Sequence, residues 1–286
     1  MSDLSNKVIV TVALSGAITN KKMNPNVPEQ PDEIQKDALA CYNEGAAVMH
    51  IHARDPQGVN SSDVKIFEDI KNRIRGDKNP VVVEFSTGGG ANLTQEQRLE
   101  CLNAGPEMAS LNMGSMMRVS GQYKGVPWSN MPEEIEWYIG RMNELNVKPE
   151  LEIYSHAMVR DMHNIIDKGL LKGPFYVDLV LGMRYQGAVD ATPQMFNQLK
   201  DLMPAGTIIN CAGVGRDQLP ITTLSILNGG HARVGLEDNV YYGKGDLATN
   251  PRLVARTVRI IRELGKEPAT PEEARQILGL KPLGAL

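Results

Sequence analysis

The chain repeats a short apolar run followed by a segment with helical spacing, about every 30 residues. The apolar runs are rich in residues that favour strands, and Gly or Pro often marks the ends of the helical segments. We predict strands at 8–14, 48–52, 80–86, 107–112, 149–154, 175–181, 207–211 and 232–236. We predict helices at 31–45, 62–75, 94–103, 132–146, 157–168, 193–202, 218–227 and 251–264. Strands that alternate with helices form a parallel sheet, because each helix returns the chain to the start of the next strand.

Eight such units predict a (β/α)8 TIM barrel. The 286 residues suit one barrel, and no break in composition marks a linker. A doubly wound open sheet is disfavoured, because neither a GxGxxG turn nor a P-loop follows any predicted strand. We therefore expect a single TIM-barrel domain over residues 1–286. A C-terminal extension from about residue 266, with a capped helix start at Thr270, is expected to pack on the barrel or on a neighbouring molecule.

The composition excludes several classes of function. A formal net charge of -4 gives no basic field that would hold nucleic acid. No segment has the roughly 18 uninterrupted apolar residues of a membrane span, and residues 1–7 lack a signal-peptide pattern, so we expect a cytoplasmic protein without a membrane partner. The widely spaced Cys41, Cys101 and Cys211 indicate buried thiols, not disulfides or a thiolate metal site.

His50 and His52 lie in one predicted strand, where alternate side chains point to the same face. Taken alone, the pair fits metal ligation or a hydrogen-bonded pair equally well. Functional groups of TIM barrels collect at the C-terminal ends of the strands, where this chain also places Glu237. Two imidazoles and one carboxylate form a common catalytic zinc site. We predict His50, His52 and Glu237 as metal ligands, because strand eight closes the barrel against strand one.

Further candidates follow the same strand ends. Asp238 is expected to point away from Glu237 and to be free to act as a general base. Arg233 shares the face of Glu237 and could hold a carboxylate, although a structural ion pair between them is an alternative. We expect Glu84 to pair with Arg233 inside the barrel. The glycines 88–90 form either a simple turn or a set of backbone N–H groups for an anion.

Motifs across nearly the whole predicted barrel resemble those of the β-keto acid cleavage enzymes. They are Gly16-Ala17, Asn24-Pro25-Asn26-Val27-Pro28, His50-Ile51-His52-Ala53-Arg54, Ser86-Thr87-Gly88-Gly89, Pro106-Glu107-Met108-Ala109-Ser110-Leu111-Asn112, Pro149-Glu150-Leu151-Glu152, Gly213-Val214-Gly215-Arg216, Gly229-Gly230-His231 and Arg233-Val234-Gly235-Leu236-Glu237-Asp238-Asn239. The resemblance implies a zinc-dependent (β/α)8 enzyme that condenses a β-keto acid with acetyl-CoA, giving acetoacetate and a new acyl-CoA. It also implies a homotetramer.

The resemblance assigns roles to individual residues. It implies zinc ligation by His50, His52 and Glu237, with Asp238 as the general base. Arg233 and Ser86 are expected to orient Asp238, and Ser110 and Glu152 are expected to contact the substrate. Further substrate-binding candidates are Thr87, Gly88, Gly89, Asn112 and Arg184.

Two positions depart from the family pattern. The family member that acts on an amino-substituted keto acid has an acidic residue where this chain has Ile18, and Arg184 stands in a loop where Pro-Gly-Gly is expected. We therefore predict a β-keto acid with a neutral or anionic tail. Two other functions stay open: a CoA-independent divalent-metal aldolase, lyase or hydrolase, and a metal-binding barrel without catalytic activity.

Overall fold

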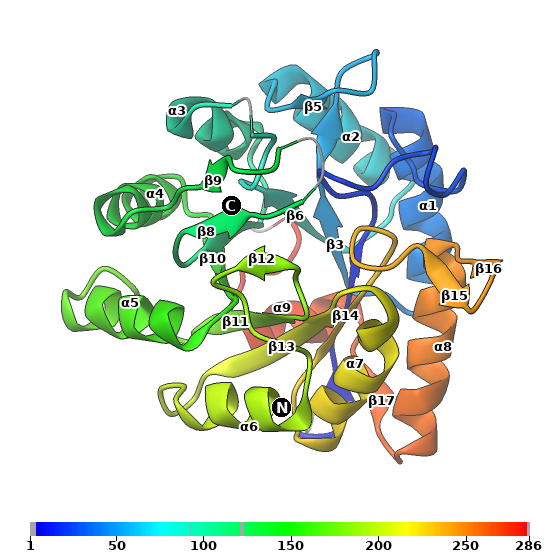
Figure 1. Cartoon of the computed structure of the whole chain (residues 1–286). Coiled ribbons are helices and arrows are strands. Elements are labelled where there is room, and N and C mark those ends of the chain that lie inside the picture. Colours follow the sequence, from blue (N-terminus) through cyan, green and yellow to red (C-terminus); the bar gives the residue numbers. More distant parts are fainter. Residues whose placement is uncertain (1–3, 92, 121–122, 285–286) are drawn as a thin grey trace.

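The computed structural model describes residues 4–91, 93–120 and 123–284. Its centre is a closed barrel of parallel strands, and helices surround the barrel (Figure 1). In pairing order the barrel strands are β10 (Lys148–Ile153), β11 (Tyr176–Leu181), β13 (Ile208–Gly213), β14 (Ala232–Val234), β2 (Val10–Ala13), β3 (Val48–Ile51), β6 (Val82–Ser86) and β7 (Met108–Asn112), with β7 closing on β10. The predicted TIM barrel is confirmed, including the seam between the last and first barrel strands.

Helices follow the strands as the apolar spacing predicts. They are α1 (Pro31–Asn43), α2 (Val64–Gly76), α3 (Gln95–Leu99), α4 (Pro132–Glu144), α5 (His156–Asp167), α6 (Pro193–Asp201), α7 (Gln218–Leu227) and α8 (Asn250–Glu263). Short 3-10 turns, η1 (Glu100–Ala104) and η2 (Gly215–Asp217), continue α3 and precede α7. The helix predicted at 94–103 is therefore split. No helix in the described part of the chain combines the length and the apolar character needed to cross a membrane.

The barrel interior is layered. At its base, apolar side chains such as Val48, Val82 and Met108 form one buried cluster. Above them, in strand register, lies a fully buried polar layer that includes His50 and Glu84. Buried ionisable groups need hydrogen bonds, partners or a bound ion to offset their desolvation. The upper half of the barrel is thus built for polar chemistry.

The C-terminal extension closes the base of the same barrel. Strand β17 (Glu267–Pro268) pairs in parallel with β1 (Lys7–Val8), and α9 (Pro271–Leu278) buries Ala274 and Leu278 in the basal apolar cluster. Arg275 of α9 donates to Glu107 and to the carbonyl oxygens of Pro80 and Val81. In Figure 1, α9 (red) lies behind the barrel strands, near the centre of the view and within the outline of the surrounding helices.

Small sheets in the loops were not predicted. A three-stranded antiparallel sheet combines β8 (Met116–Arg118), β9 (Pro127–Trp128) and β12 (Tyr185–Gln186) from the loops after β7 and β11. Two hairpins pair β4 (Ala53–Arg54) with β5 (Asn60–Ser61), and β15 (Tyr241–Gly243) with β16 (Asp246–Leu247). The strand predicted to end at residue 236 ends at Val234, because Gly235 adopts φ of +141° and leaves the extended conformation. Only glycine fits at this position, since a Cβ atom there would collide with the backbone of Ala13.

Candidate active site

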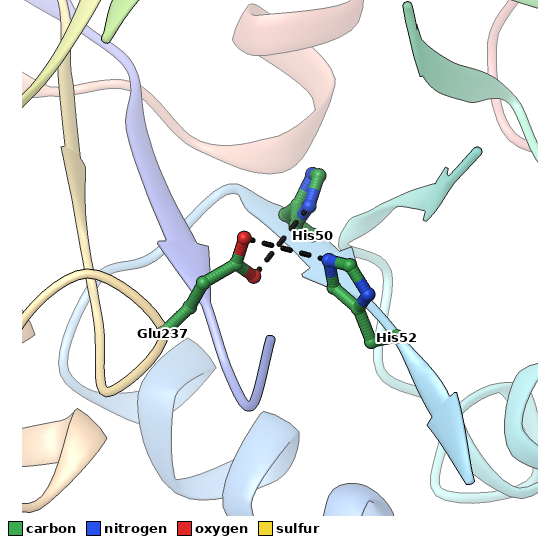
Figure 2. Close-up of side chains that lie close together, drawn as sticks. All are labelled: His50, His52 and Glu237. Atoms are coloured by element: carbon green, nitrogen blue, oxygen red, sulfur yellow. Dashed lines mark ion pairs between the residues drawn. The ribbon is translucent and has the colours of Figure 1, made fainter. Parts of the chain in front are cut away.

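Three side chains converge at the C-terminal ends of β3 and β14, the two barrel strands on either side of β2. His50 lies on β3, His52 follows it, and Glu237 follows β14 (Figure 2). His50 Nε2 lies 3.6 Å from Glu237 Oε2, and His52 Nε2 lies 3.4 Å from Glu237 Oε1. One potential ligand atom from each residue lies within 4.8 Å of the others. The strand order therefore brings together residues nearly 190 positions apart in the sequence.

The donor set fits a metal ion. His50 is fully buried, and its Nδ1 lies 2.5 Å from Glu84 Oε1, which leaves Nε2 to face Glu237. His50 Nε2 and Glu237 Oε2 are both buried without a hydrogen-bond partner among the described residues. Burial, with a contribution from Arg233, lowers the pKa of His50 to about 4, so the imidazole is neutral at pH 7. A neutral imidazole held through its other nitrogen by a carboxylate is the usual arrangement of a histidine ligand to zinc.

Gly16 explains how Glu237 fits beside strand β2. A Cβ atom at residue 16 would lie 2.5 Å from Glu237 Cγ, and the residue adopts φ of +75°. Both the space and the backbone conformation favour glycine at this position. The Gly16-Ala17 motif is therefore adjacent in space to the candidate metal ligands.

Arg233 organises the other carboxylates. Its Nη1 donates to Glu152 at 3.1 Å, and its Nη2 donates to Glu237 at 2.9 Å. Its Nε donates to Asp238 at 3.0 Å, so Asp238 is firmly oriented. Our expectation that Glu84 pairs with Arg233 is wrong, since Glu84 binds His50 instead.

The expectation that Asp238 and Glu237 point apart is also wrong. Both residues contact Arg233, because the strand ends at Val234 and the alternation of an extended chain no longer applies. Burial raises the pKa of Asp238 above its ordinary value, while the Arg233 guanidinium opposes that rise. A carboxylate whose pKa lies above its ordinary value is better suited to remove a proton near neutral pH.

A cavity of about 320 Å³ opens above these groups. Of the predicted site residues, it is lined by His52, Ser86, Gly88, Gly89, Glu152, Arg233, Glu237 and Asp238. His50 lies beneath it, fully buried. Ser86 accepts a hydrogen bond from the N–H of Gly88 at 3.0 Å, and within the described residues it makes no hydrogen bond to Asp238. Ser86 is thus placed at the cavity wall and not against the candidate base.

Four predicted substrate-binding residues do not line this cavity. Thr87 is buried and donates to the carbonyl oxygen of Ser110 at 2.7 Å. Ser110 is buried beside Ser86 on the neighbouring strand β7, with the two Oγ atoms 3.5 Å apart. Asn112 is buried, and Arg184 is exposed at the surface. Thr87, Ser110 and Asn112 are therefore buried behind the residues that line the cavity, and Arg184 is exposed away from it.

Sequence reasoning missed the aromatic wall of the cavity. Tyr154 donates to Glu152 at 3.1 Å, and its ring lies 6.0 Å from that of Trp128. Trp128, Tyr185 and Arg118 come from the small loop sheet and also line the cavity. Tyr154 is one of the polar residues at the end of a predicted strand, but the sequence assigned it no role. The other three had no comparable signal, because they lie in loops where we predicted no element.

The whole barrel matches a known family. A sequence profile described as beta-keto acid cleavage enzyme matches residues 7–280. The chain belongs to the β-keto acid cleavage enzyme family. It is 37% identical over 276 residues to the 3-keto-5-aminohexanoate cleavage enzyme of Fusobacterium nucleatum, covering 96% of this chain and 98% of that protein. The expected resemblance is confirmed, and the chain is an acyl-transferring enzyme of this family.

Other comparisons agree with this membership. The enzyme is 32% identical over 275 residues to the 3-oxoadipate:acetyl-CoA acetyltransferase of Cupriavidus necator, covering 95% of this chain and 94% of that protein. Its fold also matches the apo structure of ObcA with a TM-score of 0.74 at 18% identity, over 90% of this chain and 66% of ObcA. At that identity the structural match supports the barrel fold alone.

Proposed function

We propose that this family member is a zinc-dependent enzyme that converts a β-keto acid and acetyl-CoA into acetoacetate and a new acyl-CoA. The observation that carries the proposal is the pair of buried, unpartnered atoms His50 Nε2 and Glu237 Oε2 beside an oriented Asp238. Buried polar atoms of this kind are usually satisfied by a ligand or an ion. The name of the Cupriavidus necator relative supports acetyl-CoA as the second substrate.

The metal has a defined role in this proposal. Zn²⁺ held by His50, His52 and Glu237 would polarise the oxygens of a bound β-keto acid and so make the carbon between its two carbonyl groups more acidic. Glu84 holds His50 in the orientation that this ligation requires.

The residues around Arg233 supply the proton transfer. Asp238 removes a proton from the carbon next to the keto group, and Arg233 keeps the carboxylate of Asp238 directed at the cavity. The resulting carbanion attacks the acetyl carbonyl carbon of acetyl-CoA, so that a new carbon–carbon bond forms while the carbon–sulfur bond breaks and the CoA thiolate leaves. The CoA thiolate then attacks the original keto carbon, and retro-Claisen cleavage of the older carbon–carbon bond gives the new acyl-CoA and the carbanion of acetoacetate. This carbanion takes back the proton that Asp238 had removed, which releases acetoacetate.

Dependence on zinc and on acetyl-CoA tests the proposal. We expect a chelator to abolish cleavage of a β-keto acid and Zn²⁺ to restore it, with no cleavage when acetyl-CoA is omitted. Cleavage in the absence of any thioester would instead support the CoA-independent lyase. The homotetramer and the cytoplasmic location stay predictions, which light scattering of the purified protein and cell fractionation would test.

A further inference from the structure

The cavity carries two guanidinium groups with very different surroundings. Arg233 lies at the floor, within 3.4 Å of the carboxylates of Glu152, Asp178, Glu237 and Asp238. Arg118 lines the outer part of the cavity. No carboxylate in residues 4–91, 93–120 or 123–284 forms an ion pair with it, and its firmest hydrogen bond goes to the carbonyl oxygen of Pro127 at 3.0 Å. The charge of Arg118 is therefore not neutralised within the described chain.

The loop sheet holds Arg118 in one place. Arg118 pairs across the sheet with Tyr185, and its Cζ lies 6.0 Å from the centre of that ring. On another side it lies 5.4 Å from the centre of the Trp128 ring. Only 9% of Arg118 is exposed. A guanidinium that is stacked on aromatic rings and largely withdrawn from water is well prepared to bind an anion, because little side-chain freedom remains to be lost.

Trp128 connects Arg118 to the reacting end of the cavity. Trp128 Cζ2 lies 3.3 Å from the position that a Cβ on Gly88 would occupy, and His52 Cε1 lies 3.7 Å from the same position. The Trp128 ring thus contacts Arg118 and also lies close to Gly88, next to His52. A small β-keto acid held at the floor can extend along this ring toward Arg118.

The remaining wall excludes a cationic tail. Ile18 and Met23 line the cavity as apolar side chains, and Glu152, Glu237 and Asp238 are the only carboxylates among the described residues that line it. All three already bind Arg233. Among the described residues that line the cavity, Arg118 is therefore the one guanidinium that no carboxylate pairs with.

We propose that Arg118 binds a second carboxylate, at the far end of the substrate, so that the preferred substrate is a dicarboxylic β-keto acid. This inference deepens the proposed function and rests on it for the identity of the reacting end. Arg118, which lines the cavity, thus takes the role in binding the substrate tail that the sequence suggested for Arg184.

The test compares two keto acids that differ only at the tail, 3-oxohexanedioate and 3-oxohexanoate. We expect the unaltered enzyme to prefer the dicarboxylate. Arg118→Met should lower kcat/KM for 3-oxohexanedioate by about 10- to 100-fold, the loss expected for a charge-assisted hydrogen bond, and leave 3-oxohexanoate within about threefold. Arg118→Lys, which keeps the charge, should retain part of the preference.

Several results would overturn the inference. One is an unchanged preference in Arg118→Met, and another is a loss of preference in Arg184→Met instead. A rise in KM for acetyl-CoA without a change in tail preference would assign Arg118 to a CoA phosphate.

A binding measurement separates this inference from the proposed function. Calorimetric titration of the zinc-loaded protein with hexanedioate and hexanoate requires no turnover. We expect tighter binding of hexanedioate by the unaltered protein and equal binding of both by Arg118→Met. Arg118-dependent binding without turnover of either keto acid would support the inference while refuting the proposed function, and equal binding of both acids by the unaltered protein would overturn the inference.

Discussion

Asp238 and Glu237 are neighbours in the chain with different tasks at the candidate site. Glu237 faces His50 and His52, whereas Asp238 is held by two hydrogen bonds from Arg233. Asp238→Asn should lower kcat by at least about 100-fold, because a general base contributes roughly 10²- to 10⁴-fold. The bound zinc, measured by metal analysis, should remain at the level of the unaltered protein. Loss of zinc together with activity would contradict the separate roles.

Glu84 acts on the metal centre through His50. Because Glu84 Oε1 is hydrogen-bonded to His50 Nδ1, removing the Glu84 carboxyl group frees the imidazole to rotate or to change tautomer. Glu84→Ala should weaken zinc binding by about 10- to 100-fold, as loss of such a supporting carboxylate commonly does. Glu84→Gln keeps a side-chain oxygen that can accept from His50 and should weaken zinc binding less. Competition with a chromophoric chelator measures the zinc affinity of each variant. Equal zinc affinity in the unaltered protein, Glu84→Ala and Glu84→Gln would refute the role of Glu84 in supporting His50.

At the scale of elements, helix α8 braces the loops that carry the site. Asn250 at its start accepts from the N–H of Leu236 at 2.7 Å and donates to the carbonyl oxygen of Leu14 at 2.9 Å. It therefore joins the end of β14 to the end of β2, next to Glu237. Asn250→Ala should lower the free energy of unfolding by about 1–3 kcal/mol, since buried backbone groups lose their partners. Zinc affinity should fall as well.

The matched control for this variant is Asn164→Ala, on the exposed surface of α5. Chemical denaturation and chelator competition should leave the control close to the unaltered protein. A stability loss in Asn250→Ala without any change in zinc affinity would show that the brace does not position Glu237.

The elements of the barrel were predictable because their signal is local. Each strand is an apolar run and each helix has its own apolar face, so the order and number of units follow from the sequence. The sheet of β8, β9 and β12 was not predictable, since it pairs two- and three-residue strands from separate loops. For that reason Arg118 and Trp128 were missed, and Arg184 was chosen as the cation. The contact of Asp238 depended on where β14 ends, which Gly235 decides. The contact of Glu84 depended on the register of β6 against β3, which pairs Glu84 with His50.

At the scale of the whole molecule, stability should depend on pH through Asp37. This carboxyl group on α1 accepts a hydrogen bond from Asn250 at 2.5 Å and so links α1 to α8. Burial, opposed by that hydrogen bond, raises the pKa of Asp37 from 3.8 to about 6. The folded state therefore binds the proton more tightly than the unfolded state, and the stability gained from this group is lost as pH rises from about 4 to about 6.

Asp37→Asn removes this pH dependence and keeps an acceptor for Asn250. The rise in the pKa of Asp37 corresponds to a loss of about 3 kcal/mol in the free energy of unfolding at high pH. We reduce this figure to about 1 kcal/mol because the Asp37 side chain is partly exposed to water, which screens its charge. We expect the variant to be more stable than the unaltered protein by that amount at pH 8 and by less at pH 5, as measured by urea denaturation. An equal difference at both pH values would contradict the assignment.

The central claim is that the enzyme joins the acetyl group of acetyl-CoA to a fragment of a β-keto acid. The most direct measurement uses zinc-loaded protein, an unlabelled β-keto acid and acetyl-CoA labelled with ¹³C in the acetyl group, followed by mass spectrometry. We predict that the label appears in acetoacetate and that the new acyl-CoA is unlabelled. Unlabelled cleavage products, formed equally well without acetyl-CoA, would contradict the account.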